Sequence, residues 1–323
     1  MSTLPPSPNA IYLHINLRPV VLINMILVSI FIGTLILLHP SSAFAWGPTA
    51  HMVFANEVLS NLNLLPPLLQ QILSLYPEDY LYGNLAADIT LGKKYIEYEH
   101  HCHNWRVGFE ILKKSTSEML KAFSYGYLTH LAADAVSHNY FVPLKTVESY
   151  KGSMLHRHTY WELRFDAAIA EKNILKNAMK ITKERYHKEC DKHLDKIIHH
   201  TLFTFKTNRR IFHGLMALQN LQGYQRTMIR AHGNPKALLT KTDIEEFIYL
   251  TMISIYDFLQ KGAEASICKL DPSGETNLKR SRRLRRDLRK LSKQKNSGAL
   301  CEDKINEYRK SLRAQFGPTI LKS

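Results

Sequence analysis

The stretch "HLAADAVSH", residues 130–138, places His130, Asp134 and His138 four residues apart in a largely apolar segment. In an α-helix, residues at i, i+4 and i+8 lie on one face, so these side chains are expected to form one polar stripe. Buried charged groups are usually paired or bound to a metal ion. The stretch therefore predicts a helix that carries metal ligands. A buried polar stripe or a solvated helix face is the alternative.

Helical periodicity continues through most of the chain. Apolar residues recur at helical spacing from residue 51 onward, and we find no convincing strand alternation, internal repeat or glycine-rich phosphate loop. Helices are expected over 51–62, 68–77, 104–114, 117–142, 156–181, 188–205, 208–230 and 241–262, and a turn or short helix over 79–94. Pro143 is expected to end the helix over 117–142. The pattern predicts an all-α, multi-helix bundle with one main domain over residues 46–270.

The composition agrees with a globular, histidine-rich protein. The chain has 323 residues, 45% of them hydrophobic, which is enough for a large core. Its four cysteines include no C-x-x-C pair, which argues against a cysteine zinc site, although Cys268 and Cys301 could form a disulfide. Sixteen histidines is a high count, and histidine is the commonest metal ligand among side chains.

The net charge of +15 is unevenly distributed. Residues 271–323 contain 15 basic and 6 acidic side chains, whereas residues 46–270 carry only about +5. In this tail Leu284, Leu288 and Leu291 recur at helical spacing among cations. The tail is therefore expected to be either a basic amphipathic helix for an anionic lipid surface or acidic partner, or a solvated or partly disordered segment. The mild charge of the main domain disfavours nucleic acid as a partner.

The N-terminus has the layout of an export signal. Residues 20–38 are apolar and uncharged, Arg18 precedes them, and Ala43-Phe44-Ala45 forms a small-x-small cleavage motif. This pattern predicts a signal peptide over residues 1–45 and a periplasmic or secreted protein. An uncleaved membrane anchor is the alternative, because the apolar run is long enough to span a bilayer. Cleavage after Ala45 would give Trp46 a free α-amino group.

Other ligand-type residues follow a definite order along the chain. They are Trp46 and His51 in "WGPTAH", Asp88 in "NLAAD", His100, His101 and His103 in "YEHHCHNW", and His158 and Glu162 in "MLHRHTYWEL". Each is weak evidence by itself, since Asp88 alone could be a helix N-cap and loop histidines are often only exposed. Together with the stretch 130–138, they indicate a composite metal site.

This order resembles the zinc-dependent phospholipase C family, whose architecture is shared by the single-strand-specific zinc nucleases. In these enzymes the mature chain begins with tryptophan, whose α-amino nitrogen and carbonyl oxygen bind one of three clustered zinc ions. The resemblance implies that Trp46 and His51 bind one zinc, that Asp88, His101 and His130 bind a second, that Asp134 bridges these two, and that His138, His158 and Glu162 bind the third. His103 is the alternative to His101. The spacing Asp134-x-x-x-His138 is shorter than the family's D-x-x-x-x-x-H.

The resemblance also implies a function. Carboxylate-bridged zinc ions cleave phosphodiesters by polarising phosphoryl oxygens and activating water, and Asp88 would serve as the general base that orients the water. The expected protein is an exported phospholipase C that acts on phospholipid headgroups at a membrane surface. The alternatives are a zinc nuclease and a non-catalytic zinc-binding protein of the envelope.

Overall fold

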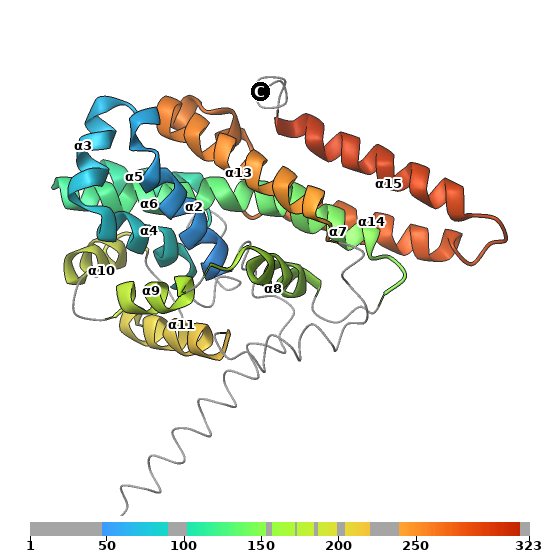
Figure 1. The fold of residues 1–323 in the computed structure, drawn as a ribbon, viewed down its shortest axis with the longest axis horizontal. Helices are drawn as coiled ribbons and strands as arrows, with labels where there is room; N and C mark the ends of the chain where they lie inside the picture. Colours follow the sequence, from blue (N-terminus) through green and yellow to red (C-terminus); the bar gives the residue numbers. More distant parts are fainter. Residues whose placement is uncertain are drawn as a thin grey trace, which may run out of the picture. The chain divides into compact units, whose positions relative to one another are not determined.

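A computed structural model describes residues 47–89, 102–152, 157–171, 173–183, 187–198, 204–219 and 239–316. The chain divides into two compact units, Met1–His39 and Pro40–Ser323, and all the described residues belong to the second unit. The regular structure of these ranges is entirely helical, without a strand (Figure 1). The all-α prediction is therefore confirmed.

The described helices follow one another along the chain. In chain order they are α2 (Pro48–Ser60), α3 (Pro67–Leu75), α4 (Pro77–Ile89), α5 (Trp105–Lys113), α6 (Glu118–Val136), α7 (Val142–Glu148), α8 (Arg157–Ile169), α9 (Ile174–Ile181), α10 (Lys188–Asp195), α11 (Phe205–Gln219), α13 (Lys241–Lys261), α14 (Glu275–Leu291) and α15 (Gly298–Arg313). Helix α6 is central, because α2, α3, α4, α5, α10 and α13 all pack against it. Nearly every residue from Leu120 to Val136 is buried, as expected for a helix that other helices surround.

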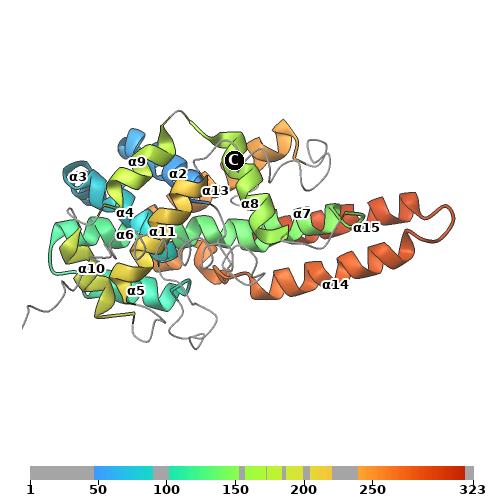
Figure 2. The same cartoon turned by 90° about the horizontal axis from the view of Figure 1, so that it is seen from below.

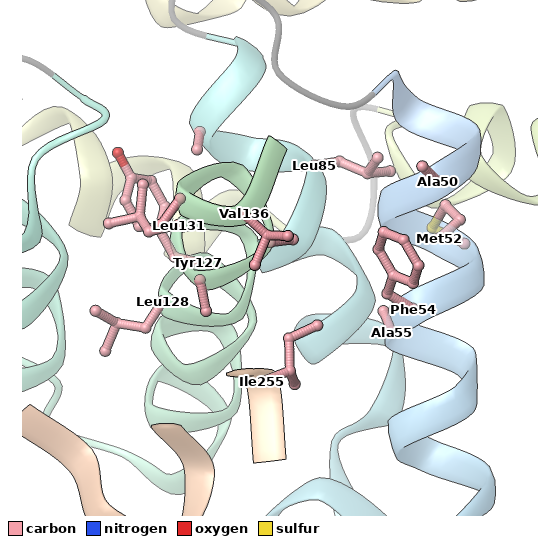
Figure 3. Packing of buried hydrophobic residues seen from close by; sticks show 14 of the residues in the cluster. Ala50, Met52, Phe54, Ala55, Leu85, Tyr127, Leu128, Leu131, Val136 and Ile255 are labelled. Atoms are coloured by element: carbon pink, nitrogen blue, oxygen red, sulfur yellow. The ribbon is translucent and has the colours of Figure 1, made fainter. Parts of the chain in front are cut away.

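Helices α4 and α6 approach each other unusually closely at two glycines. A Cβ on Gly83 would lie 2.0 Å from the carbonyl oxygen of Phe123, and one on Gly126 would lie 2.0 Å from that of Tyr80. Figure 3 shows the neighbouring core, where α2, α4 and α6 contribute side chains such as Phe54 to one apolar cluster. The two glycines permit a contact that brings the C-terminal ends of α4 and α6, with their polar residues, to one place.

The helix that contains "HLAADAVSH" does not end at Pro143, contrary to the sequence prediction. Helix α6 continues into a π-helical turn, Ser137–Phe141, and then directly into α7, in which Pro143 occupies the first turn. The wider turn changes the hydrogen-bond register, and a proline in the first turn of a helix needs no N–H partner. His138 lies within this π-turn, so its direction is set by a local departure from α-helical geometry.

Several other predicted boundaries were wrong. The helix predicted over 156–181 is divided into α8 and α9 by Asn173, whose φ of 72° is left-handed and cannot continue a right-handed helix. The turn or short helix expected over 79–94 overlaps α4, a helix of 13 residues that begins earlier, at Pro77, and ends at Ile89. Helix α10 ends at Asp195, short of the predicted 205, and residues 220–230 of the next predicted helix lie outside the described residues.

The basic segment after residue 270 forms an ordered helical hairpin. Figures 1 and 2 show α14 and α15 antiparallel and side by side, and both helices contact α7. On α14, Leu278 and Leu288 are buried, while Leu284 and Leu291 pack partly buried against the core. The apolar stripe noted in the sequence is thus used for packing within the chain. All four cysteines are free, so Cys268 and Cys301 do not form the disulfide considered above.

Across the described ranges, no helix has both the length and the apolar character needed to cross a bilayer. Residues 20–38, on which the export prediction rests, lie outside the described residues. The signal peptide therefore remains a prediction.

Candidate metal centre

The polar stripe of residues 130–138 is buried as predicted. His130 and Asp134, from α6, are fully inaccessible to solvent, and His138 in the π-turn is 1% exposed. Other helices bring further ligand-type side chains to this stripe: His51 from α2, Asp88 from α4, His103 from the segment before α5, and His158 and Glu162 from α8. The solvated-face alternative is thereby excluded, and two groups of side chains result.

The first group surrounds the carboxylate of Asp134. Its Oδ1 lies 3.2 Å from Nε2 of His51, while its Oδ2 lies 2.9 Å from Nε2 of His103 and 3.2 Å from Nε2 of His130. Asp88 joins the same group, with Oδ1 3.3 Å from Nε2 of His103. The two carboxylate oxygens of Asp134 thus face different sets of nitrogens, as a bridging ligand requires.

The ring of His130 is oriented by the backbone of α4. Its Nδ1 donates a hydrogen bond of 2.8 Å to the carbonyl oxygen of Asn84, which can only accept. In a neutral imidazole, Nε2 then carries the lone pair, and this lone pair faces Nε2 of His103 at 3.1 Å. A backbone carbonyl behind a ligating histidine is the usual outer partner of a metal site. The ring of His51 stacks on that of His130, with centroids 3.8 Å apart.

The second group repeats this arrangement around His138. Its Nδ1 donates to the carbonyl oxygen of Pro272, so its Nε2 lone pair points toward Nε2 of His158, 3.0 Å away. Nε2 of His158 also lies 2.6 Å from Oε1 of Glu162, one turn further along α8. The structure therefore brings the H-x-x-x-E pair together with His138, in a group that could hold a metal ion.

These nitrogen and oxygen atoms are better arranged to bind a divalent cation than to hydrogen-bond with one another. Within the described part of the chain, neither carboxylate oxygen of Asp134 makes a well-aligned hydrogen bond, although three imidazole nitrogens lie within 3.2 Å. Lone pairs that face each other at about 3 Å repel unless a proton or a cation lies between them. Imidazole and carboxylate together suit zinc, which accepts both in tetrahedral sites.

Electrostatics favour the metal-binding protonation states. Burial, followed by the electrostatic influence of the neighbouring His130, lowers the pKa of His51 from 6.5 to about 4. Burial alone would raise the pKa of Asp134, but the surrounding imidazoles of His130, His103 and His51 outweigh it and hold that pKa well below its usual range. At neutral pH, His51 is therefore a neutral ligand and Asp134 an anionic one, as metal coordination requires.

Sequence reasoning did not assign a role to Asp166 at this site. It follows Glu162 by four residues on α8 and is 6% exposed. Its carboxylate accepts hydrogen bonds from the backbone N–H groups of Thr49 (3.2 Å) and Ala50 (3.1 Å), at the N-terminus of α2. Because His51 lies in the same turn, Asp166 joins the helix of the second group to a residue of the first. The spacing H-x-x-x-E-x-x-x-D was the signal that could have identified it.

The histidine cluster at 100–103 is partly resolved by the structure. His103, the alternative in the sequence prediction, lies in the first group and is 2% exposed, whereas His100 and His101 lie outside the described residues. Trp46 also lies outside them, although Gly47, its neighbour, is buried against Asp166. The structure thus places seven of the nine predicted ligands in two adjoining groups and adds His103 to them.

A further set of ligand-type residues, Asp79, His187 and Cys190, has an explanation without metal. Nδ1 of His187 donates to Oδ1 of Asp79 at 2.8 Å, which pairs the two groups. Burial, followed by the charge of Asp79, raises the pKa of the Cys190 thiol and so disfavours the thiolate that a metal would need. This set is a buried hydrogen-bonded group between α4 and α10.

Comparison with known proteins agrees with the geometry. A family model described as zinc dependent phospholipase C matches residues 50–254. The match includes both groups of side chains and ends before the α14–α15 hairpin. No curated protein and no solved structure matches the chain.

Proposed function

Because the chain belongs to the zinc-dependent phospholipase C family, we propose that it is an exported zinc metallohydrolase that cleaves the headgroup phosphodiester of phospholipids. The observation that carries this proposal is the carboxylate of Asp134, whose two oxygens face His51 on one side and His103 and His130 on the other. This arrangement can hold two cations a few ångströms apart, which is the device that many phosphodiesterases use.

We assign eight described side chains and one terminus to as many as three zinc ions. One ion would be held by His51 and the terminus of Trp46, and a second by Asp88, His103 and His130. Asp134 would bridge these two ions. A third ion would be held by His138, His158 and Glu162. His103 replaces His101 in this assignment because it contacts Asp134 directly, at 2.9 Å. Bound zinc supplies Lewis-acid polarisation of the phosphoryl group and lowers the pKa of a coordinated water.

The protein's own groups would orient the reaction. Asn84 and Pro272, through their carbonyl oxygens, fix the rings of His130 and His138, so that each Nε2 points into its group. Asp88 lies beside His103 at the edge of the first group, and we assign it a second role as the acceptor of the nucleophilic water's proton. Burial of both groups excludes bulk water, which strengthens each of these interactions.

The charge distribution favours a lipid over a nucleic acid as substrate. Residues 46–270 carry a net charge of about +5, which is modest for a surface that must follow a phosphate backbone. The excess positive charge lies on the α14–α15 hairpin, outside the family match. A zinc nuclease and a non-catalytic zinc-binding protein remain the competing functions.

Two measurements on the purified protein test the proposal. Elemental analysis with mass spectrometry of the N-terminus should give two to three zinc ions per chain and Trp46 as the first residue. Release of phosphorylated headgroup from phospholipid vesicles should then exceed release of nucleotides from single-stranded DNA. Digestion of DNA alone would establish the nuclease, and full zinc content with neither activity would establish the non-catalytic protein.

A further inference from the structure

The hairpin that follows the family match is joined to the metal centre at its first residues. Gly274, the N-cap of α14, is in contact with His138, and Asn277 donates a hydrogen bond of 2.8 Å to the side-chain oxygen of Asn139. The carbonyl oxygen of Pro272 accepts the Nδ1 hydrogen of His138. A surface that bound α14 would therefore be held in a fixed relation to the second group of ligands.

The outward face of α14 is almost entirely cationic. Helix α14 contains eight basic and two acidic residues, whereas the neighbouring α15 contains four and three. Six exposed cations recur at intervals of three and four residues and so share one face, here called the cationic stripe: Lys279, Arg282, Arg283, Arg286, Arg289 and Lys290. The stripe is about 16 Å long, at 1.5 Å of rise per residue.

The other two cations of α14 have structural roles. Arg280 lies over the ring of Tyr308 in α15, 5.2 Å from its centroid. Arg285 is 2% exposed and donates hydrogen bonds to the carbonyl oxygens of Tyr150 and Gly152. These contacts stabilise the hairpin without the stripe. Within the stripe, Lys279 forms an ion pair with Glu275 at 2.5 Å, and the other five cations are like charges that repel one another along the helix.

We propose that the cationic stripe of α14 binds the anionic surface of a phospholipid bilayer and so brings the metal centre to its lipid. The identity of the partner rests on the proposed function, because a phospholipid hydrolase must work at a bilayer surface. The contact is electrostatic and does not insert into the acyl chains, since the leucines of α14 already pack within the protein. Lys279 lies about one and a half turns beyond Gly274, so the bound surface begins near the second ligand group.

The test compares two triple variants of the full chain in vesicle co-sedimentation. Arg282→Gln, Arg286→Gln and Arg289→Gln remove three charges at i, i+4 and i+7 of the stripe. The matched control, Lys176→Gln, Lys180→Gln and Lys183→Gln, removes three exposed charges at the same spacing on and just after α9. Glutamine has nearly the helix propensity of arginine and lysine, so both variants should fold, which circular dichroism checks.

On vesicles of phosphatidylcholine with phosphatidylglycerol, the α14 variant should partition on the order of 100-fold more weakly than the unaltered protein. Each basic residue near an anionic surface contributes about fivefold (about 1 kcal/mol). The α9 variant should partition like the unaltered protein, and the affinity of the latter should fall as salt is added. Equal losses in both variants, or equal binding to phosphatidylcholine alone, would overturn the proposal.

The same variants separate this inference from the proposed function. Hydrolysis of a water-soluble, short-chain phospholipid should be equal in both, because neither variant alters a metal ligand. Binding to vesicles through α14 without hydrolysis of any lipid would support the membrane-binding role of the stripe and contradict the proposed phospholipase activity. Hydrolysis of phospholipid without α14-dependent binding would support the phospholipase activity and contradict the membrane-binding role of the stripe. Binding of the stripe to single-stranded DNA but to no vesicle would also contradict that role.

Discussion

Two regions of this molecule bury charged side chains, and they balance those charges differently. On α7, Lys145 is fully buried, and its Nζ lies 2.8 Å from both Glu148 and Asp243, while Arg309 of α15 contacts the same two carboxylates at 2.8 and 3.1 Å. Every buried charge there has an opposite charge within the chain. At the metal centre, by contrast, carboxylates and imidazole lone pairs converge on one another.

The contrast lies in the kind of side chain that accompanies the carboxylates of the metal centre. The chain places no lysine or arginine among His51, Asp88, His103, His130 and Asp134, within the residues described. An imidazole balances a buried carboxylate only when it is protonated, so we expect a bound cation to supply positive charge to this region at neutral pH. The charges around α7 are balanced by side chains of the chain itself, whereas the charge balance of the metal centre should depend on zinc.

The largest expected effect follows from Asp134→Asn. An amide cannot bridge two cations with two anionic oxygens, so this variant should lose two zinc ions and the hydrolytic activity. A ligand present at 1,000 times its Kd stabilises a protein by about 4 kcal/mol, so the loss in stability should be several kcal/mol. Asp303→Asn, at an exposed position of α15, is the control. Full zinc content in Asp134→Asn would refute the bridging role.

The next largest effect is expected from Lys145→Met, which tests the ion-pair region around α7. Removal of Lys145 leaves the buried Asp243 and the partly buried Glu148 with less compensation and should cost about 3–5 kcal/mol in urea unfolding. The loss should be the same with and without a zinc chelator. Lys261→Met, which breaks an exposed ion pair with Asp257, should cost less than about 1 kcal/mol. A chelator-dependent loss in Lys145→Met would show that the two regions are not independent.

A smaller, more local effect is expected from Gly274→Ala. The added Cβ would lie 2.4 Å from the carbonyl oxygen and 2.5 Å from the Cβ of His138, so the second ligand group should shift and one zinc ion should be lost. Gly262→Ala provides a matched control, because its φ of +59° resembles the +56° of Gly274 but no atom lies within 4 Å of the added Cβ. Both variants place a Cβ on a residue with positive φ, so equal zinc content would show that Gly274 does not position His138.

The smallest effect is a pH dependence of the metal-free protein. Because burial lowers the pKa of His51 from 6.5 to about 4, the unfolded chain binds a proton at this residue between these values and the folded chain does not. Stability should therefore fall as the pH falls from about 6.5 to about 4, by at most about 3 kcal/mol from this group. Urea unfolding of chelated protein measures the slope, and His51→Asn should flatten it. An unchanged slope in that variant would assign the dependence to other groups.

Local sequence determined much of this protein. Helical periodicity indicated the all-α class, and the i, i+4 spacing of His130 and Asp134 placed both on one face, because side-chain direction in a regular α-helix depends on residue number. The H-x-x-x-E pair of α8 was readable for the same reason. The direction of His138 depends instead on the π-turn that contains it. Boundaries were less predictable, since Asn173 breaks a helix through a backbone conformation and Pro143 is tolerated by a π-turn beside it.

Tertiary structure determined the contacts that residue spacing along the sequence does not encode. His103 lies in the first ligand group because the segment before α5 approaches α6, a relation that no local pattern encodes. The carbonyl oxygens of Asn84 and Pro272, which orient His130 and His138, are backbone groups that every residue has, so only the fold can select them. The leucines of α14 were equally suited to a membrane or to α7, and packing within the chain covered them while the cationic stripe stayed exposed to solvent.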